Sequence, residues 1–290
     1  MNEESKLIQP LDPLARYNRE AWDQQVENGQ RWTQPVEAEV IARARKGDWE
    51  IVLTPSRPIP KNWFGSLSNA EVLCLASGGG QQVPILAAAG ARVTVLDNSP
   101  RQLEQDRLVA RREGLEIRTV LGDMRSMTKL GGESFDLIVH PCSNCFVPEI
   151  QPVWSECFRV LKAGGSLLAG FLKSVTFIFD ENAVSEGKLE VRHRLPYSDQ
   201  SHLTQAEIQK LQQAGEPLMF SHSLEQQIGG QLRAGFQLVD LYEDRDSEDL
   251  MSNYFAPYLA THARKPADPA VSVSYTHLRD HETREERGLR

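Results

Sequence analysis

The sequence predicts an α/β protein with a Rossmann-like, mainly parallel seven-stranded sheet and helices on both faces. Apolar, strand-like runs alternate with helical segments from residue 70 to residue 172, and the alternation resumes near residue 223. A glycine-rich turn follows the first run, and an aspartate ends the second. Because parallel strands need crossover connections, repeated strand–helix–strand units favour a parallel sheet that is covered on both faces.

Seven short apolar runs are the predicted strands. They are residues 71–76, 92–97, 116–122, 135–140, 166–172, 236–244 and a last run within 254–265. Ser99 before Pro100, with Gln102 three residues after the serine, predicts the start of a helix after the second strand. Pro152 predicts the start of another helix, which we expect to end at Gly164 with a left-handed cap.

The sequence pattern divides the chain into a main domain, an N-terminal cap, an inserted lobe and a tail. Residues 70–265 form the predicted main domain, and residues 1–69, where apolar and aromatic side chains recur at helical spacing, form an N-terminal helical cap. Residues 173–222 interrupt the alternation after the fifth strand and are predicted to form an inserted substrate lobe, in which 188–199 resembles an extra strand or hairpin. Residues 266–290 have no apolar periodicity and resemble a disordered or non-native tail.

Composition narrows the possible partners. The 290 residues include 32 basic and 40 acidic side chains, a net charge of −8, so we expect no nucleic-acid partner. No apolar run approaches the roughly 20 residues that span a bilayer, and the N-terminus lacks the pattern of a secretion signal. The four cysteines suit a reducing cytoplasm better than a disulfide framework.

The glycine-rich turn at 78–80 suits two classes of cofactor. Such a turn lets the backbone approach a ligand closely. Dinucleotides favour G-x-G-x-x-G, and here Gly78 and Gly80 supply the first two glycines while Val83 occupies the third position. S-adenosylmethionine has no phosphate, and three glycines followed by Gln81 and Gln82 are compatible with its adenosyl and amino-acid groups.

Asp97 ends the second predicted strand, about twenty residues after the first glycine. A carboxylate in this position can accept hydrogen bonds from both hydroxyls of a ribose. It would also repel a 2′-phosphate, which disfavours NADP. We therefore predict that Asp97 binds the ribose of either cofactor, although a surface acid after a strand is the simpler alternative.

Five ordered segments resemble one enzyme family. They are "LASGGGQQ" (75–82), "VTVLDNSPRQL" (93–103), "LGDMRSM" (121–127), "FDLIVHPCSNCF" (135–146) and "FRVLKAGGSLLAGF" (158–171). On these segments, residues 70–172 resemble a class I S-adenosylmethionine-dependent methyltransferase, of the broad group related to ubiquinone-biosynthesis methyltransferases. A helix, "LKAGG" and then an apolar strand form the usual fifth unit of that family.

The resemblance implies S-adenosylmethionine as the cofactor. Asp97 would bind its ribose. Asp123 would accept from the adenine amino group, with Met124 packed on the ring, and His140 would lie beside the reactive methyl group. The residues implied to bind the cofactor are Ala76, Ser77, Gly78, Gly80, Asp97, Asn98, Gln102, Asp123, Met124 and His140. The family commonly places an acid at the end of the first strand, where this chain has Ala76.

Candidates for chemistry cluster in "HPCSNCF" (140–146). Methyl transfer from a sulfonium is an in-line displacement, and a general base is needed only when the acceptor arrives protonated. His140 could be that base, or it could simply bond to the backbone. Cys142 and Cys145 form a single C-x-x-C pair, so we expect no closed metal site. The predicted substrate-lining residues are Tyr17, Trp22, Ser143, Asn144 and Tyr197, with Trp32 and His222 as further candidates.

The sequence therefore predicts a methyltransferase that uses S-adenosylmethionine to methylate a small organic molecule by in-line displacement. An NAD-linked oxidoreductase on the same type of sheet is an alternative, against which Val83 and "LKAGG" argue. A binding module without turnover is a second alternative, for which Ala76 is the only hint. No motif identifies the acceptor or the oligomeric state.

Overall fold

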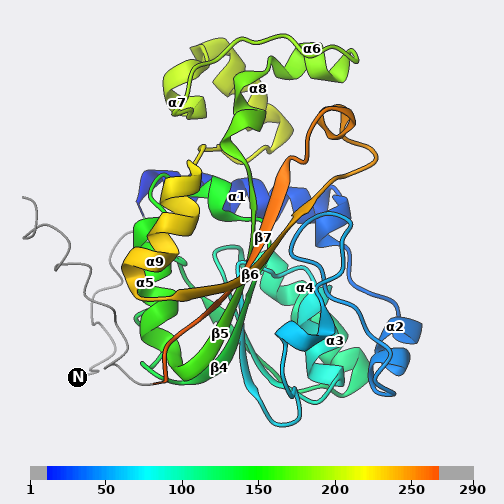
Figure 1. The fold of residues 1–290 in the computed structure, drawn as a ribbon. Coiled ribbons are helices and arrows are strands. Elements are labelled where there is room, and N and C mark those ends of the chain that lie inside the picture. The colour runs from blue at the N-terminus through cyan, green and yellow to red at the C-terminus, as the bar shows by residue number, and fades with distance from the viewer. Residues whose placement is uncertain (1–11, 268–290) are drawn as a thin grey trace, which may run out of the picture.

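A seven-stranded sheet forms the centre of the computed structural model, which describes residues 12–267 (Figure 1). Its strands are β1 Glu71–Leu75, β2 Arg92–Asp97, β3 Ile117–Leu121, β4 Phe135–His140, β5 Leu161–Leu172, β6 Gln237–Asp244 and β7 Tyr258–Arg264. The order is β3-β2-β1-β4-β5-β7-β6. The pairs among β1 to β5 are parallel, and β7 is antiparallel to both of its neighbours. The predicted mainly parallel, seven-stranded sheet is confirmed.

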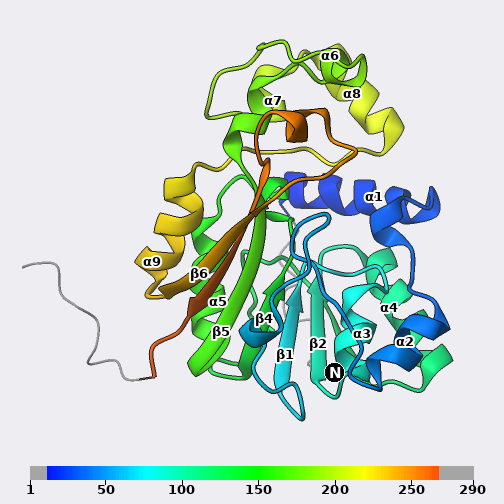
Figure 2. The same ribbon diagram turned by 45° about the vertical axis from the view of Figure 1, so that its right-hand side comes forward.

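Helices cover both faces of the sheet (Figure 2). They are α2 Ala38–Ala44, α3 Gln82–Ala88 and α4 Pro100–Glu113 on one face, and α5 Gln151–Val160 and α9 Gly230–Ala234 on the other. Successive side chains of a strand point to opposite faces. Thus β1 sends Val72 and Cys74 into one hydrophobic core and Leu73 and Leu75 into the other. All four are fully buried, and each apolar side chain buried in this way contributes about 1.5–3 kcal/mol to stability.

The ends of two helices test the predicted caps. Ser99 Oγ accepts from the Gln102 amide at 3.0 Å, so α4 begins as predicted. The predicted end of α5 is wrong by several residues: the helix stops at Val160, and β5 begins at once because Leu161 pairs with β4. Gly164 is left-handed, with φ of 80°, but it lies within β5. Within residues 12–267, no helix is both long and apolar enough to cross a membrane.

The N-terminal helix α1, Pro13–Glu27, lies across the upper ends of the strands, beneath the lobe (Figure 2). Asn18 is buried on this helix and donates through Nδ2 to the carbonyls of Phe146, at 2.9 Å, and Leu218, at 3.1 Å. The Leu218 amide donates back to Asn18 Oδ1 at 2.8 Å. One asparagine thus fastens the N-terminal segment to the loop after β4 and to the end of the lobe.

Residues 173–222 form a lobe above the sheet (Figure 1). Its helices are α6 Glu181–Ser185, α7 Asp199–His202 and α8 Gln205–Ala214. The extra strand or hairpin expected at 188–199 is not formed in these described residues, where only isolated bridges occur, at Val191 and Ser198. The amides of Arg192 and His193 both donate to the Ile178 carbonyl, which breaks the regular pairing that a hairpin needs.

Candidate active site

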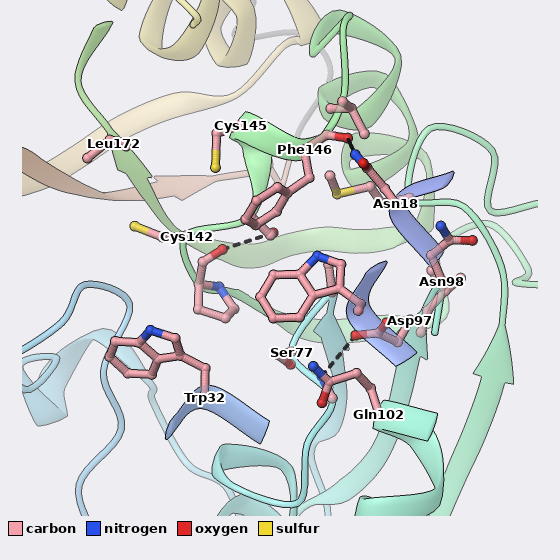
Figure 3. Close-up of a pocket in the computed structure, with 18 of the residues that line it drawn as sticks. Asn18, Trp32, Ser77, Asp97, Asn98, Gln102, Cys142, Cys145, Phe146 and Leu172 are labelled. Atoms are coloured by element: carbon pink, nitrogen blue, oxygen red, sulfur yellow. Dashed lines mark hydrogen bonds between the residues drawn. The ribbon is translucent and has the colours of Figure 1, made fainter. Parts of the chain in front are cut away.

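A cavity of about 350 Å³ lies at the carboxyl ends of the parallel strands, where ligands bind in sheets of this type. We name its two sides by their residues. The aspartate side consists of residues 76–78, 96–98, 102 and 123–125, and the cysteine side consists of residues 53–55, 141–143, 145–148, 172, 219 and 258. Figure 3 shows Asp97 and Gln102 on the opposite side of the view from Cys142, Cys145 and Leu172. The cavity is also lined by α1 and by residues 31–32.

The glycine turn after β1 is held by its own amides. The Gly78 amide donates to Asp97 Oδ2 at 3.0 Å, and the Gly79 amide donates to the Gln102 carbonyl at 3.0 Å. The Gly80 amide donates to Asp106 Oδ1, also at 3.0 Å. The turn is therefore fixed against β2 and α4. Gly78 lines the cavity, whereas Gly80, which we predicted as a cofactor contact, is turned away from it against α4.

Asp97 lies where the sequence predicts a ribose-binding carboxylate. It lines the cavity, and its Oδ1 accepts from the Ser99 amide at 2.9 Å. Burial raises the pKa of Asp97 to about 6, against the lowering effect of these backbone donors. Asp106 is fully buried behind the turn, and burial together with the nearby Asp97 raises its pKa well above the usual range. At neutral pH, Asp97 is thus the ionised member of the pair.

Ala76, directly after β1, is a non-glycine residue with a left-handed backbone, with φ of 46°. A side chain makes this conformation cost about 1 kcal/mol. We therefore expect Ala76→Gly to raise the free energy of unfolding by about 0.5–1 kcal/mol, measured by urea denaturation. The matched variant Ala88→Gly, in α3, should lower it by a similar amount. A destabilised Ala76→Gly protein would contradict the strain at this position.

Asp123 and Met124, for which the resemblance implies contacts with the adenine, also line the aspartate side. Asp123 is engaged by Arg125, whose Nη2 donates to its Oδ2 at 2.7 Å. Arg125 also donates to Asp12 Oδ2 at 2.8 Å, and the two carboxylates raise the pKa of the guanidinium. Met124 is buried beside this pair. Arg125, which is not among the predicted site residues, thus fixes the rim of the cavity.

His140 does not reach the cavity. Its side chain is 0% exposed and is absent from the lining. Its Nδ1 lies 3.0 Å from the Leu75 carbonyl, and its Nε2 lies 2.6 Å from Asn144 Oδ1. Burial lowers its pKa. The sequence left two roles open for His140, a general base and a structural residue. The geometry favours the structural role, because each ring nitrogen already has a hydrogen-bond partner within the protein.

The other predicted residues divide into two groups. Those that line the cavity are Trp22, Trp32, Ser77, Asn98, Gln102 and Ser143. Those that do not are Tyr17, Asn144, Tyr197 and His222. The Tyr17 hydroxyl donates to the Glu216 carbonyl at 3.0 Å, and the Tyr197 hydroxyl donates to Asp199 Oδ1 at 2.6 Å. Both tyrosines thus stabilise the lobe rather than contact the cavity.

Several lining residues carry no motif and were missed. They include Thr54, Pro55, Pro148, Leu172, Met219 and Tyr258. The segment 51–55 reaches the cavity because the Leu53 carbonyl accepts from the Cys142 amide at 3.0 Å. Tyr258 begins β7, beside the end of β5. A tyrosine at the start of the strand paired with β5 is the only signal that could have found it.

Burial keeps the thiols of the cysteine side protonated. It raises the pKa of Cys142 well above its usual value and that of Cys145 to about 12. All four cysteines are free. Among the described residues, no group of three or more His, Cys, Asp or Glu is placed to hold a metal ion.

Comparisons with known proteins identify the family. A methyltransferase-domain model matches residues 73–169, from β1 into β5. An uncharacterized methyltransferase of Bacillus subtilis, YbaJ, is 48% identical over 255 residues, which are 88% of this chain and 100% of the relative. The chain belongs to the class I S-adenosylmethionine-dependent methyltransferases. In this methyltransferase, the matched region contains the glycine turn, Asp97 and the loop after β4.

Solved structures share the fold of this methyltransferase. A 1,6-didemethyltoxoflavin-N1-methyltransferase of Burkholderia thailandensis, solved with 1,6-didemethyltoxoflavin and S-adenosylhomocysteine bound, aligns with a TM-score of 0.55 and 15% identity, over 92% of this chain and 98% of that one. A putative S-adenosylmethionine-dependent methyltransferase of Listeria monocytogenes aligns with a TM-score of 0.54 and 16% identity, over 71% of this chain and 95% of that one.

Proposed function

We propose that this methyltransferase binds S-adenosylmethionine along the aspartate side and transfers its methyl group to a small molecule on the cysteine side. The position of Asp97 carries the proposal. Its carboxylate lines the cavity at the end of β2, beside the glycine turn. A cavity of about 350 Å³ falls in the range of small-molecule sites.

The polar atoms of the aspartate side support the fit of the cofactor. Ser77 Oγ and Gln102 Oε1 are buried without a hydrogen-bond partner among the described residues. Leaving such an atom unpaired costs about 1–3 kcal/mol, so a polar ligand beside it would be stabilising. Each oxygen of Asp97 accepts one backbone amide, from Gly78 and from Ser99, and keeps a second lone pair. Two ribose hydroxyls match these two free positions.

The remaining contacts follow from the lining. Met124 offers a buried apolar surface for the adenine ring, and Asn98 borders the ribose position. Ala76, Ser77 and Gly78 border the path toward the cysteine side. Gly80 and His140 have no part in this proposal, because neither lines the cavity.

Transfer requires alignment and the exclusion of water more than acid–base chemistry. The bound cofactor supplies an electrophilic methyl group on a positively charged sulfur. Trp22 packs edge-on against Phe146, with ring centroids 5.1 Å apart, and both line the cavity beside the loop after β4. Trp32 lines it from the N-terminal segment. These rings would exclude water and hold the acceptor near the carboxyl ends of the strands.

The acceptor is proposed to be small and organic. The described residues that enclose the cysteine side come from several elements, and Met219 comes from the lobe. A structure that aligns over 92% of this chain holds 1,6-didemethyltoxoflavin, a small molecule, although its 15% identity supports the fold alone.

Titration calorimetry tests the proposed function directly. We expect S-adenosylmethionine and S-adenosylhomocysteine to bind with micromolar dissociation constants, and NAD not to bind. Val83 is fully buried at the position where a dinucleotide site favours glycine, which argues against NAD. Binding of NAD in place of the sulfonium would overturn the proposal. Cofactor binding without methyl transfer to any acceptor would instead indicate a binding module.

Cofactor affinity should depend on pH through Asp97. The carboxyl has a pKa raised to about 6, so it is ionised above that pH and protonated below it. An ionised carboxylate is the stronger acceptor for ribose hydroxyls. We expect affinity to be constant from pH 7 to 8 and to fall by up to tenfold per unit below pH 6, measured by calorimetry in matched buffers. In Asp97→Asn, the weaker remaining binding should lose this dependence.

We also propose a cytoplasmic location. Four free cysteines, with Cys74 and Cys157 fully buried, are compatible with a reducing compartment. Fractionation of cells that express the tagged protein tests this, and recovery in an extracellular fraction would contradict it.

A further inference from the structure

The cysteine side has a chemical character that constrains the acceptor. Among the described residues that line it, no histidine, lysine, aspartate or glutamate occurs. Its titratable groups are Cys142, Cys145 and Tyr258. Burial raises the pKa of all three, so each is neutral at physiological pH and none is a base. No described residue of the cysteine side can therefore remove a proton from an acceptor.

Arg31, a cation whose charge acts on Tyr258, is already neutralised. Arg31 lines the cavity, but its Nη2 lies 2.9 Å from Asp246 and its Nη1 lies 2.8 Å from Glu248. Its guanidinium also stacks over Trp32, 4.4 Å from the ring centroid. Arg31 therefore offers little to a strongly hydrated anion such as a carboxylate, which needs several donors when it is buried.

Tyr258 supplies a neutral donor. Its hydroxyl forms no hydrogen bond to another described residue, although the side chain lines the cavity and is only partly exposed. Burial, then the carboxylates of Asp249 and Asp246 and the nearby Cys142, raise its pKa, so the hydroxyl keeps its proton. An anionic atom placed next to it would accept one charge-assisted hydrogen bond.

The remaining walls are apolar, aromatic or sulfur-containing. Phe146, Val147, Pro148, Leu172 and Met219 complete the enclosure with the two thiols. Such surfaces favour a polarisable, weakly hydrated group over a strongly hydrated one. They also offer no carboxylate to stabilise the positive charge that an amine nitrogen gains as it accepts a methyl group.

We propose that the cysteine side binds an apolar thiol, which reacts as its thiolate with the Tyr258 hydroxyl as hydrogen-bond donor. This inference rests on the proposed function. The thiol loses its proton to solvent before the reaction. The new bond joins the thiolate sulfur to the methyl carbon, and the bond from that carbon to the sulfonium sulfur breaks. The electron pair stays on the departing sulfur, which becomes the neutral thioether of S-adenosylhomocysteine.

Four acceptors with the same ring separate the possibilities: benzenethiol, phenol, benzoate and aniline. We expect kcat/KM for benzenethiol, after subtraction of the uncatalysed rate and with a non-thiol reductant present, to exceed that for phenol by at least about thirtyfold. Ionisation sets this lower bound: an alkyl thiol has a pKa of about 8.5, about 1.5 units below that of a phenol, and an aryl thiol is more acidic still. Benzoate and aniline should be poorer still. A higher kcat/KM for phenol, benzoate or aniline would overturn the inference.

The pH profile separates ionisation of the acceptor from that of an enzyme group. With benzenethiol, kcat/KM should rise with pH and level off above the pKa of the thiol. With the more acidic 4-nitrobenzenethiol, the same rise should move to lower pH. S-adenosylmethionine is kept saturating at every pH, so that the ionisation of Asp97 does not enter the profile. A rise that then stays at one pH for both thiols would assign the proton to an enzyme base and contradict the inference.

Binding to Tyr258→Phe gives a measurement that is independent of turnover. With S-adenosylhomocysteine bound, quenching of the tryptophans that line the cavity reports acceptor binding. At a pH where benzenethiol is ionised, Tyr258→Phe should weaken its binding about tenfold and leave methyl phenyl sulfide, which has no charge, unchanged. Tyr254→Phe, at a 70% exposed position outside the lining, is the matched control and should change neither.

Equal loss for both ligands in Tyr258→Phe would indicate a packing role and refute the proposed donor. Different outcomes refute the proposed function and the thiol acceptor. Absence of S-adenosylmethionine binding in calorimetry would overturn the proposed function itself. If the protein binds the cofactor tightly but methylates phenol, benzoate or aniline in preference to the thiol, the proposed function is retained and the thiol is refuted as the acceptor.

Discussion

Asp97→Ala is expected to weaken the binding of S-adenosylmethionine by at least tenfold. The carboxylate offers two free lone pairs to the ribose, and charged hydrogen bonds contribute about 1.5–3 kcal/mol each. The substitution also leaves the amides of Gly78 and Ser99 without their acceptor, so the glycine turn itself should loosen. Calorimetry with S-adenosylmethionine measures the loss.

Two further variants separate binding from folding. Asp97→Asn keeps the size of the side chain and one acceptor oxygen, so it should retain the fold and still lose most of the affinity. Asp48→Ala removes an exposed aspartate that does not line the cavity, and this variant should bind the cofactor normally. Unchanged affinity in both Asp97 variants would remove the main support for the proposed site.

The aspartate side could be predicted because its signals are local. Asp97 must stand at the end of β2 once the strand is recognised, and a glycine turn after β1 must face the same edge of the sheet. Parallel pairing of β1 with β2 then brings the two together, with Leu75 opposite Leu96. Strand periodicity and one turn are therefore sufficient to find the position proposed for the ribose.

Beyond residues 140–146, the cysteine side could not be predicted, because distant segments assemble it. Residues 53–55, Leu172, Met219 and Tyr258 meet there only through β7, the lobe and the connector before β1. The same limit explains why the orientation of the His140 side chain could not be predicted. The sequence places it correctly at the end of β4, but whether its ring points toward the cavity or into the protein depends on Asn144 and the Leu75 carbonyl. Tyr17 and Tyr197 were assigned to the cavity by residue type, whereas their partners in the lobe decide their positions.

Gly170→Ala should produce the largest loss of stability. Gly170 lies in β5 opposite Ala260 of β7, and a Cβ atom there would lie 2.2 Å from the Leu53 carbonyl oxygen. That oxygen also accepts from the Cys142 amide. The two atoms nearest to the added Cβ are the carbonyl oxygen and the carbonyl carbon of Leu53. Because both belong to the backbone, no side-chain rotation relieves the clash, and segment 51–55 must move away. We expect the free energy of unfolding to fall by about 3 kcal/mol, measured by urea denaturation, since overpacking a buried contact costs about 1–3 kcal/mol or more.

The displacement should also reach the cavity, because Leu53 and Cys142 both line its cysteine side. Gly170→Ala is therefore expected to weaken binding of the acceptor more than binding of the cofactor. Gly132→Ala is the matched control: its added Cβ would lie 3.5 Å from the Arg159 carbonyl oxygen, an ordinary contact. If Gly170→Ala were as stable as Gly132→Ala, segment 51–55 could not be packed on β5, and the enclosure of the cysteine side would have to be formed differently.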